Sequence, residues 1–312
     1  MQVEVQGQTL KLPDFLLVGA AKSGTTSLAD YLRQHPQIFM PEEKELHFFA
    51  FAAEPPSYST SHCLGPVLVT DFHEYARYLS PAPNGAVIGE ASVSYFLRHL
   101  YRRCIQNIQK FHPRWQELKI VIILRNPIER AFSAYVSQLS YLESKPFRQA
   151  IEAWRKREEE GWSPVYDYLG GSFYAEPLSA YKRTFPKTRV YLFEDLRDRP
   201  EWLMRDLYQF LSVNPGFSPE FKKLNPSMVP VLKPLFRLLT KPGLVSSVFP
   251  FVDSLLPLRQ RVEMVDRIRT LFRRASKPQM KKEDRDYLKA LFREDILRTQ
   301  ELIGRDLSEW LQ

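Results

Sequence analysis

One stretch decides the fold, and it reads FLLVGAAKSGTTSL at residues 15–28. Its apolar start predicts a buried strand, the small residues predict a loop, and the end of the stretch predicts the start of a helix. A strand that leads through such a loop into a helix presents backbone N–H groups and the positive end of the helix dipole to an anion. We therefore expect an anion-binding loop at the end of this strand.

The glycines of this loop are spaced almost as in the P-loop of nucleoside triphosphatases. Gly19 and Gly24 fit the pattern G-x-x-x-x-G, but Thr25 and Thr26 follow where that loop has Lys-Ser/Thr. The lysine is Lys22, inside the loop. A triphosphatase needs its lysine after the second glycine and a hydroxyl on Mg²⁺. The loop therefore favours a phosphate ester without a triphosphate tail over a Mg²⁺-dependent kinase or another P-loop phosphotransferase.

The rest of the chain alternates between predicted strands and predicted helices. Strands are expected at 15–18, 87–88, 120–124 and 190–193, and helices at 26–34, 97–111, 128–142, 178–184 and 200–211. Continuous apolar strands between helices are typical of a parallel sheet with helices on both faces. The fold class is therefore α/β, a P-loop-like parallel sheet with a helical C-terminal extension. Ligands of such sheets bind at the carboxyl ends of the strands, where Lys22 and Arg125 both lie.

The whole chain, residues 1–312, is expected to form a single domain whose core spans 13–212. Proline-rich residues 54–83 predict a loop over the sheet edge. Residues 224–258 are either a helical hairpin on the core or a lid over an acceptor pocket. Residues 283–311 are expected to form a helix that packs on the core through one face. That face carries Leu288, Leu291, Phe292, Ile296 and Ile303.

Composition limits the partners. The net charge of +8 suits an anionic ligand, but the basic residues are scattered and no nucleic-acid motif occurs, so we expect no nucleic-acid partner. Cys63 and Cys104 allow one disulfide without requiring it, and neither has the spacing of a metal site, so we expect no metal. The N-terminus is polar and no run of about 18 apolar residues occurs, so we expect a cytoplasmic protein without a transmembrane segment.

Three further motifs follow the anion loop: KELHFF at 44–49, GEASVSY at 89–95 and ILRNPIERAFSAY at 123–135. In this order they resemble the motifs of sulfotransferases that use 3′-phosphoadenosine 5′-phosphosulfate (PAPS), in the bacterial and heparan-sulfate-type branch. The resemblance covers residues 13–212 and resumes near 278–311. It implies an enzyme that moves the sulfuryl group of PAPS to an acceptor hydroxyl. The motifs leave the acceptor open between a lipid-like molecule, an acyl or polyketide chain and a glycan.

The donor site follows from the loop and from the resemblance. Lys22 is expected to stabilise the leaving phosphate, while the backbone and hydroxyls of the loop hold the 5′-phosphate. The resemblance implies that Arg125 and Ser133 bind the 3′-phosphate and that two residues of the segment 170–174 contact the nucleotide. Arg130 has either Glu129 or another neighbour as its partner and is left out of the site. The expected donor-binding residues are Lys22, Ser23, Gly24, Thr25, Thr26, Ser27, Arg125, Ser133, Ser172 and Tyr174.

A general base is expected in the segment 44–49, because an acceptor hydroxyl is a poor nucleophile at neutral pH. The resemblance makes Glu45 the base, whereas His47 is either the base itself or a group that orients the acceptor. Their side chains share one side of the chain if the segment is extended. Lys44 is a candidate contact for the sulfate of the donor.

The motif at 89–95 departs from the glycan-sulfating relatives. Ala91 stands where these relatives often carry a lysine, so the resemblance does not extend to heparan-type specificity. Glu90 is either a second carboxylate that lines the cleft or a group that orients Lys22. A non-catalytic nucleotide- or polyanion-binding protein is the remaining alternative, which the joint presence of a candidate base and a leaving-group lysine disfavours.

Overall fold

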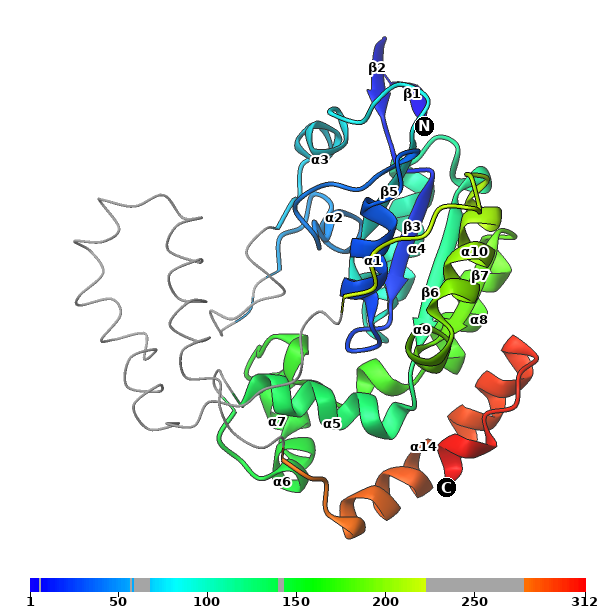
Figure 1. Ribbon diagram of the computed structural model, residues 1–312. Helices are drawn as coiled ribbons and strands as arrows, with labels where there is room; N and C mark the ends of the chain where they lie inside the picture. Colours follow the sequence, from blue (N-terminus) through cyan, green and yellow to red (C-terminus); the bar gives the residue numbers. More distant parts are fainter. Residues whose placement is uncertain (6, 57, 59–67, 140–142, 223–277) are drawn as a thin grey trace, which may run out of the picture.

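The computed structural model describes residues 1–5, 7–56, 58, 68–139, 143–222 and 278–312 (Figure 1). Its centre is a five-stranded sheet in which every pair of neighbours is parallel. The strands, in sheet order, are β4 Ile38–Phe39, β5 Val87–Ala91, β3 Phe15–Gly19, β6 Lys119–Leu124 and β7 Thr188–Leu192. Parallel strands share one direction, so the loops after β3, β5 and β6 meet at one edge of the sheet.

Both faces of the sheet are buried, which explains why its strands are continuously apolar. Along β6, Val121 and Ile123 point to one face while Ile120 and Ile122 point to the other, because successive side chains alternate in a strand. The first face is covered by α1 Thr25–Arg33 and α10 Pro200–Leu211, and the second by α4 Tyr101–Phe111 and α8 Ala175–Thr184. Figure 1 shows α1 in front of the sheet and α4 behind it. The predicted fold class is confirmed.

The remaining elements surround this core. α5 follows β6 and runs across below the carboxyl ends of the strands (Figure 1). The N-terminal strands β1 and β2 pair as a separate antiparallel hairpin, which the sequence did not predict. The elements not yet given are β1 Gln2–Val5, β2 Gln8–Lys11, α2 Phe48–Phe51, α3 Phe72–Leu79, η1 Val93–Phe96, η2 Trp115–Glu117, α5 Pro127–Gln138, α6 Phe147–Glu152, α7 Trp154–Glu159, η3 Pro164–Tyr166, η4 Gly170–Ser172, α9 Phe193–Asp198, α14 Lys282–Ile303 and η5 Ser308–Leu311.

The C-terminal helix α14 packs on α5 and α8, as its apolar face predicts. Leu288, Phe292 and Ile296 are fully buried, and the Phe292 ring lies edge-on against Phe173 with 4.9 Å between ring centroids. The carboxylate of Asp295 accepts hydrogen bonds from two backbone N–H groups at the start of α8. This helix therefore holds the segment that precedes α8 as well as the helix itself.

Several predicted boundaries are wrong, and one predicted loop contains a helix. The strand expected at 87–88 continues to Ala91, and the helix expected at 178–184 begins at Ala175. The helix expected at 97–111 begins at Tyr101, and the helix expected at 128–142 ends at Gln138. The segment 54–83 contains α3, whose N-terminus is capped by Asp71. Residues 140–142 and 224–258 lie outside the described residues, as does Cys63, while Cys104 is buried in α4.

Candidate functional site

The loop after β3 has the conformation that an anion site requires. Gly24 has a left-handed φ of 94°, and a Cβ atom at this position would lie 2.7 Å from Leu196 of α9, so only glycine fits. Helix α1 begins at the next residue, Thr25, without a side-chain cap. The N–H groups of its first turn therefore lack intrahelical partners and are directed at the space beyond the helix end. That space suits an anion.

The side chains of the loop add charge and hydroxyl groups. Lys22 is exposed, and its ammonium makes no ion pair within the described part of the chain. Its pKa is lowered, first because surrounding protein atoms displace water from the ammonium and next because the Arg130 guanidinium lies nearby. Ser23 is fully buried, and its hydroxyl has no hydrogen-bond partner among the described residues. A buried hydroxyl normally has a partner, so this group fits a ligand in the loop.

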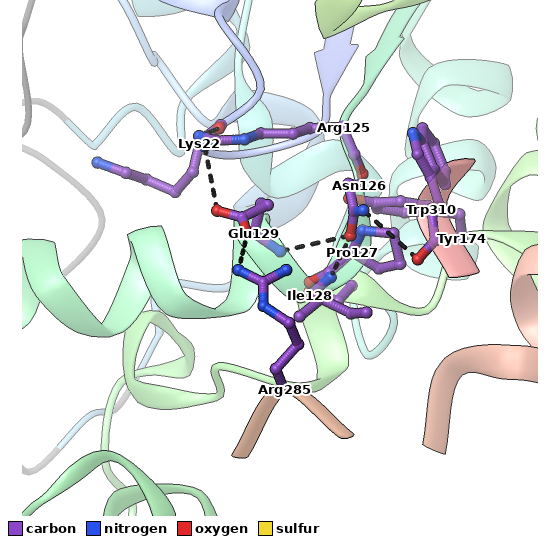
Figure 2. A network of polar contacts seen from close by, with 10 residues as sticks. Lys22, Arg125, Asn126, Pro127, Ile128, Glu129, Tyr174, Arg285 and Trp310 are labelled. Atoms are coloured by element: carbon purple, nitrogen blue, oxygen red, sulfur yellow. Dashed lines mark hydrogen bonds and ion pairs between the residues drawn. The ribbon is translucent and has the colours of Figure 1, made fainter. Parts of the chain in front are cut away.

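Arg125 lies directly after β6, as predicted, and its side chain reaches toward the anion loop. Its Nη1 donates a hydrogen bond of 3.2 Å to the Lys22 carbonyl, and its Cζ lies 4.8 Å from the centre of the Phe193 ring. Glu129 lies 4.0 Å from Arg125 and pairs at 2.6 Å with Arg285 of α14. Figure 2 shows Glu129 between the two arginines. The guanidinium is thus held at the edge of the loop by α5, α9 and the C-terminal helix.

The other residues assigned to the nucleotide lie behind Arg125. The Ser172 hydroxyl donates to the Pro127 carbonyl at 3.0 Å, and the Tyr174 hydroxyl donates to the Arg125 carbonyl at 2.8 Å. Both side chains are fully buried and support the backbone that carries Arg125. Ser133 is buried on α5, two turns from the start of the helix. Contacts of these three side chains with a nucleotide remain predictions.

Arg130 is a buried cation that sequence reasoning left out of the site. Its guanidinium donates to the Ser172 hydroxyl and to the Tyr168 carbonyl, both at 2.6 Å, and both partners are neutral. Within the described ranges it forms no ion pair, although the more distant Asp167 favours its charge. The only sequence signal for its burial, an arginine among the mostly apolar residues of 127–136, was overlooked. Arg130 therefore adds positive potential beneath the anion loop.

The segment that carries the candidate base is not extended, so the condition under which the two side chains were expected to share one side is not met. Glu45 and His47 have left-handed φ values of 67° and 59°, and α2 begins immediately afterwards. The two side chains still meet, with His47 Nε2 3.8 Å from Glu45 Oε2. The Lys44 ammonium lies 3.2 Å from Glu45 Oε1 and donates to the Thr26 hydroxyl at 2.9 Å. Lys44 therefore joins the candidate base to the anion loop.

Burial separates the two candidate bases. The Glu45 side chain is 26% exposed, whereas the His47 side chain is fully buried. The His47 Nδ1 atom lies 2.8 Å from the Ser94 hydroxyl, within hydrogen-bond distance. Glu45 is therefore the group with access to an acceptor, and His47 lies behind it.

Glu90 fits neither of its expected roles. It is 1% exposed, so it does not line an open cleft, and no hydrogen bond or ion pair joins it to Lys22 among the described residues. The Ser92 hydroxyl instead donates to Glu90 Oε1 at 2.5 Å. The pKa of Glu90 is raised to about 7, mainly because the side chain is buried; the nearby negative charge of Glu45 also raises this pKa, whereas the hydroxyl groups of Ser92 and Tyr95 lower it.

No group of three or more histidine, cysteine or carboxylate side chains is arranged to hold a metal ion within the described residues. None of the helices described is both long enough and apolar enough to cross a membrane.

The strand order and the loop after β3 define a P-loop-like α/β protein with an anion site at the carboxyl edge of its sheet. Comparison with known proteins identifies the family. A model of the Sulfotransferase family matches residues 13–217, and the chain belongs to this family. The loop with Lys22, the segment 44–49 and Arg125 all lie within the matched part.

Individual relatives support the same conclusion. The solved sulfotransferase from Alicyclobacillus acidocaldarius is 28% identical and superposes with a TM-score of 0.73, covering 97% of this chain and 100% of that one. A membrane-associated sulfotransferase of Dictyostelium discoideum, kil1, is 22% identical across 72% of this chain and 61% of its own length. A human heparan sulfate glucosamine 3-O-sulfotransferase, number 6, is 29% identical across 56% of this chain and 44% of its own. The chain thus spans less than two thirds of both curated relatives.

Proposed function

We propose that this protein is a PAPS-dependent sulfotransferase that transfers a sulfuryl group to an acceptor hydroxyl. The observation that carries the proposal is the junction made by Lys44. Its ammonium touches the Thr26 hydroxyl of the anion loop and the carboxylate of Glu45. A candidate base therefore lies beside the site for the leaving phosphate, and a transfer reaction requires both in one place.

The donor is assigned to the anion loop and to Arg125. The N–H groups at the start of α1 suit the 5′-phosphate, as does the Ser23 hydroxyl, which has no hydrogen-bond partner in the described part of the chain. The guanidinium of Arg125 suits the 3′-phosphate, because its planar fork binds phosphate oxygens in pairs. Ser133 is the proposed second contact for that phosphate. The buried charge of Arg130 favours any anion held above it.

The groups of this site can account for each bond that is formed or broken in the transfer and for the proton that is released. The acceptor oxygen forms a bond to sulfur while the bond from sulfur to the bridging phosphate oxygen breaks. Negative charge grows on that bridging oxygen, and the Lys22 ammonium is proposed to stabilise it. The acceptor proton passes to the Glu45 carboxylate. His47, which is buried behind Glu45, is proposed to orient the carboxylate.

The acceptor is proposed to be a hydroxyl of a lipid-like molecule, an acyl or polyketide chain, or a glycan. Ala91 contributes no charged side chain, since it is 4% exposed and packs in the core. This observation argues against the recognition of an acidic sugar through that position. A cytoplasmic location and a single domain remain predictions.

Calorimetry with 3′-phosphoadenosine 5′-phosphate (PAP), the spent donor, tests the proposal. PAP should bind without Mg²⁺, and AMP and ATP should bind much more weakly because they lack the 3′-phosphate. For variants of the site such as Lys22→Ala, the matched control is Lys187→Ala. This exposed lysine precedes β7 at the opposite edge of the sheet. A screen of acceptors with ³⁵S-labelled PAPS then identifies the acceptor class. Equal affinity for PAP and AMP, or tight binding of ATP only with Mg²⁺, would refute the proposal.

A further inference from the structure

Three hydrogen bonds from the end of β5 and from the η1 turn that follows it hold the segment that carries the candidate base. Glu45 N–H donates to the Ala91 carbonyl at 3.0 Å, and His47 N–H donates to the Ser92 hydroxyl at 3.0 Å. The His47 ring and the Ser94 hydroxyl form the third. Both residues of the segment have left-handed backbones, which non-glycine residues adopt only when the surroundings enforce them. The geometry of the base thus depends on these bonds.

One of the three bonds depends in turn on Glu90. A serine hydroxyl has a single proton, and in Ser92 that proton is donated to Glu90 Oε1. The Ser92 oxygen is then free to accept from the His47 N–H. Without an acceptor at Glu90, the Ser92 hydroxyl is free to rotate and loses its fixed orientation. Glu90, Ser92 and His47 therefore form one chain of hydrogen bonds that ends at the base segment.

We propose that Glu90 is a positioning residue for sulfuryl transfer, which acts through Ser92 to hold His47 and so keeps the Glu45 carboxylate beside the anion loop. This inference rests on the proposed function of Glu45. Glu90 itself touches neither donor nor acceptor, since its carboxyl group is closed off from solvent.

The burial of Glu90 is difficult to explain by stability alone. No hydrogen bond of normal geometry reaches its second oxygen, Oε2, among the described residues, although the Tyr95 hydroxyl lies near enough to favour the charged form. A buried carboxyl group with an unbonded oxygen destabilises a fold, and an apolar residue of similar size is often as good or better there. A carboxyl group at this position is therefore explained by what it does for the site.

The surroundings of Glu90 also make its charge sensitive to pH. Burial is the main cause of its raised pKa, the charge of Glu45 adds to it, and Lys44 opposes it. The other titratable groups that face it are Tyr75 of α3, Tyr95 of η1, Cys104 of α4 and Tyr181 of α8. Because a carboxylate accepts a stronger hydrogen bond than a neutral carboxyl group, ionisation of Glu90 tightens its hold on Ser92.

A double-mutant cycle tests the chain of hydrogen bonds. Glu90→Leu and Ser92→Ala are each expected to slow ³⁵S transfer roughly 10- to 100-fold, because a small displacement of a reacting group costs about that much. The double variant should be no slower than the slower single variant, since residues that act as a unit are not additive. The PAP dissociation constant should stay unchanged in all three. Ser163→Ala, at a buried serine outside the site, is the control for a lost hydroxyl.

Two readouts separate positioning from a purely structural role. Glu90→Gln keeps an acceptor oxygen and should retain most of the transfer rate, but it should lack the inflection near pH 7 that we expect in the pH profile of the wild-type rate. The ¹⁵N signals of the His47 ring, assigned by comparison with His47→Gln, should shift alike in Glu90→Leu and Ser92→Ala. Additive losses, an unchanged rate in Glu90→Leu, or unchanged His47 signals would each overturn the inference.

The proposed function can fail separately from this inference. If Glu45→Gln transfers sulfate as fast as the wild type, Glu45 is not the base, whatever the histidine signals show. Those signals need neither donor nor acceptor, so they test the connection from Glu90 to His47 in either case.

Discussion

Replacement of Glu90 by glutamine should remove a pH dependence from the stability of the fold. The pKa of this buried carboxyl is about 7 in the folded protein, against 4.5 for an exposed glutamate. Between these values the folded chain keeps a proton that the unfolded chain has lost. The free energy of unfolding should therefore fall as the pH rises from 4.5 to 7 and stay level above that. Glutamine does not titrate, so its stability lacks this slope.

The size of the effect follows from the two pKa values. Each pH unit between them is worth about 1.4 kcal/mol, so the whole interval contributes roughly 3 kcal/mol. Domains are typically stable by about 5–15 kcal/mol, so this contribution is large enough to measure. The variant should accordingly gain roughly 3 kcal/mol relative to the wild type between pH 4.5 and 7.5.

Urea unfolding of both proteins at half-unit steps of pH measures this difference. The wild-type curve alone is insufficient, because burial lowers the pKa of His112. Protonation of this histidine in the unfolded chain destabilises the folded protein as the pH falls through the same window. Subtracting the two curves removes that contribution. Glu201→Gln, at an exposed residue of α10, is the control for loss of a carboxylate. A difference curve that is flat across the interval, or one that slopes the other way, would show that Glu90 is ionised in the fold and refute the reasoning.

Four further predictions concern the site itself. Lys22→Ala should reduce transfer about 10²- to 10³-fold with little change in PAP affinity, because the ammonium acts on charge that develops in the transition state; near-normal turnover would exclude the role. Arg125→Ala should weaken PAP binding about 10- to 100-fold and abolish the preference for PAP over AMP, which calorimetry measures; an unchanged preference would assign the 3′-phosphate elsewhere. Arg130→Met should weaken PAP roughly tenfold without loss of thermal stability, because a nearby buried unit charge contributes about 1–2 kcal/mol at an effective dielectric near 20; unchanged affinity would mean that the charge serves only the fold. Glu45→Gln should slow transfer about 10²- to 10⁴-fold and His47→Ala less, and the reverse order in single-turnover assays would make the histidine the base.

The sequence predicted the central parts of the fold because their signals are local. An apolar run, a loop of small residues and a helix are contiguous at 15–28, and α10 was predicted with its observed boundaries. The strand β4 has only two residues and therefore carries no periodic pattern. The helix α3 lies in a proline-rich segment, and its cap Asp71 was the signal that was overlooked. Short elements that depend on tertiary contacts are the ones that sequence patterns miss.

The positions of two candidate site residues follow from the predicted fold, whereas the geometry around the candidate base does not. Lys22 and Arg125 lie where strand ends place them, because that position follows from the parallel sheet. The left-handed backbones of Glu45 and His47 were invisible in the sequence, since bonds from the end of β5 and from the η1 turn enforce them. The burial of Arg130 was missed for the same reason: its partners come from 168–172, some 40 residues further along the chain.

The resemblance predicted near 278–311 coincides with helix α14. This helix follows the core in sequence, but it packs on α5 and α8, next to the proposed donor residues. Arg285 pairs with Glu129, which lies beside Arg125 (Figure 2). Asp295 accepts hydrogen bonds from the backbone that includes Tyr174, whose hydroxyl donates to the Arg125 carbonyl. The Arg125 residue is thus held from both sides by contacts of α14. Because a bidentate phosphate contact requires a fixed guanidinium, this support would serve the proposed donor site without α14 touching the donor.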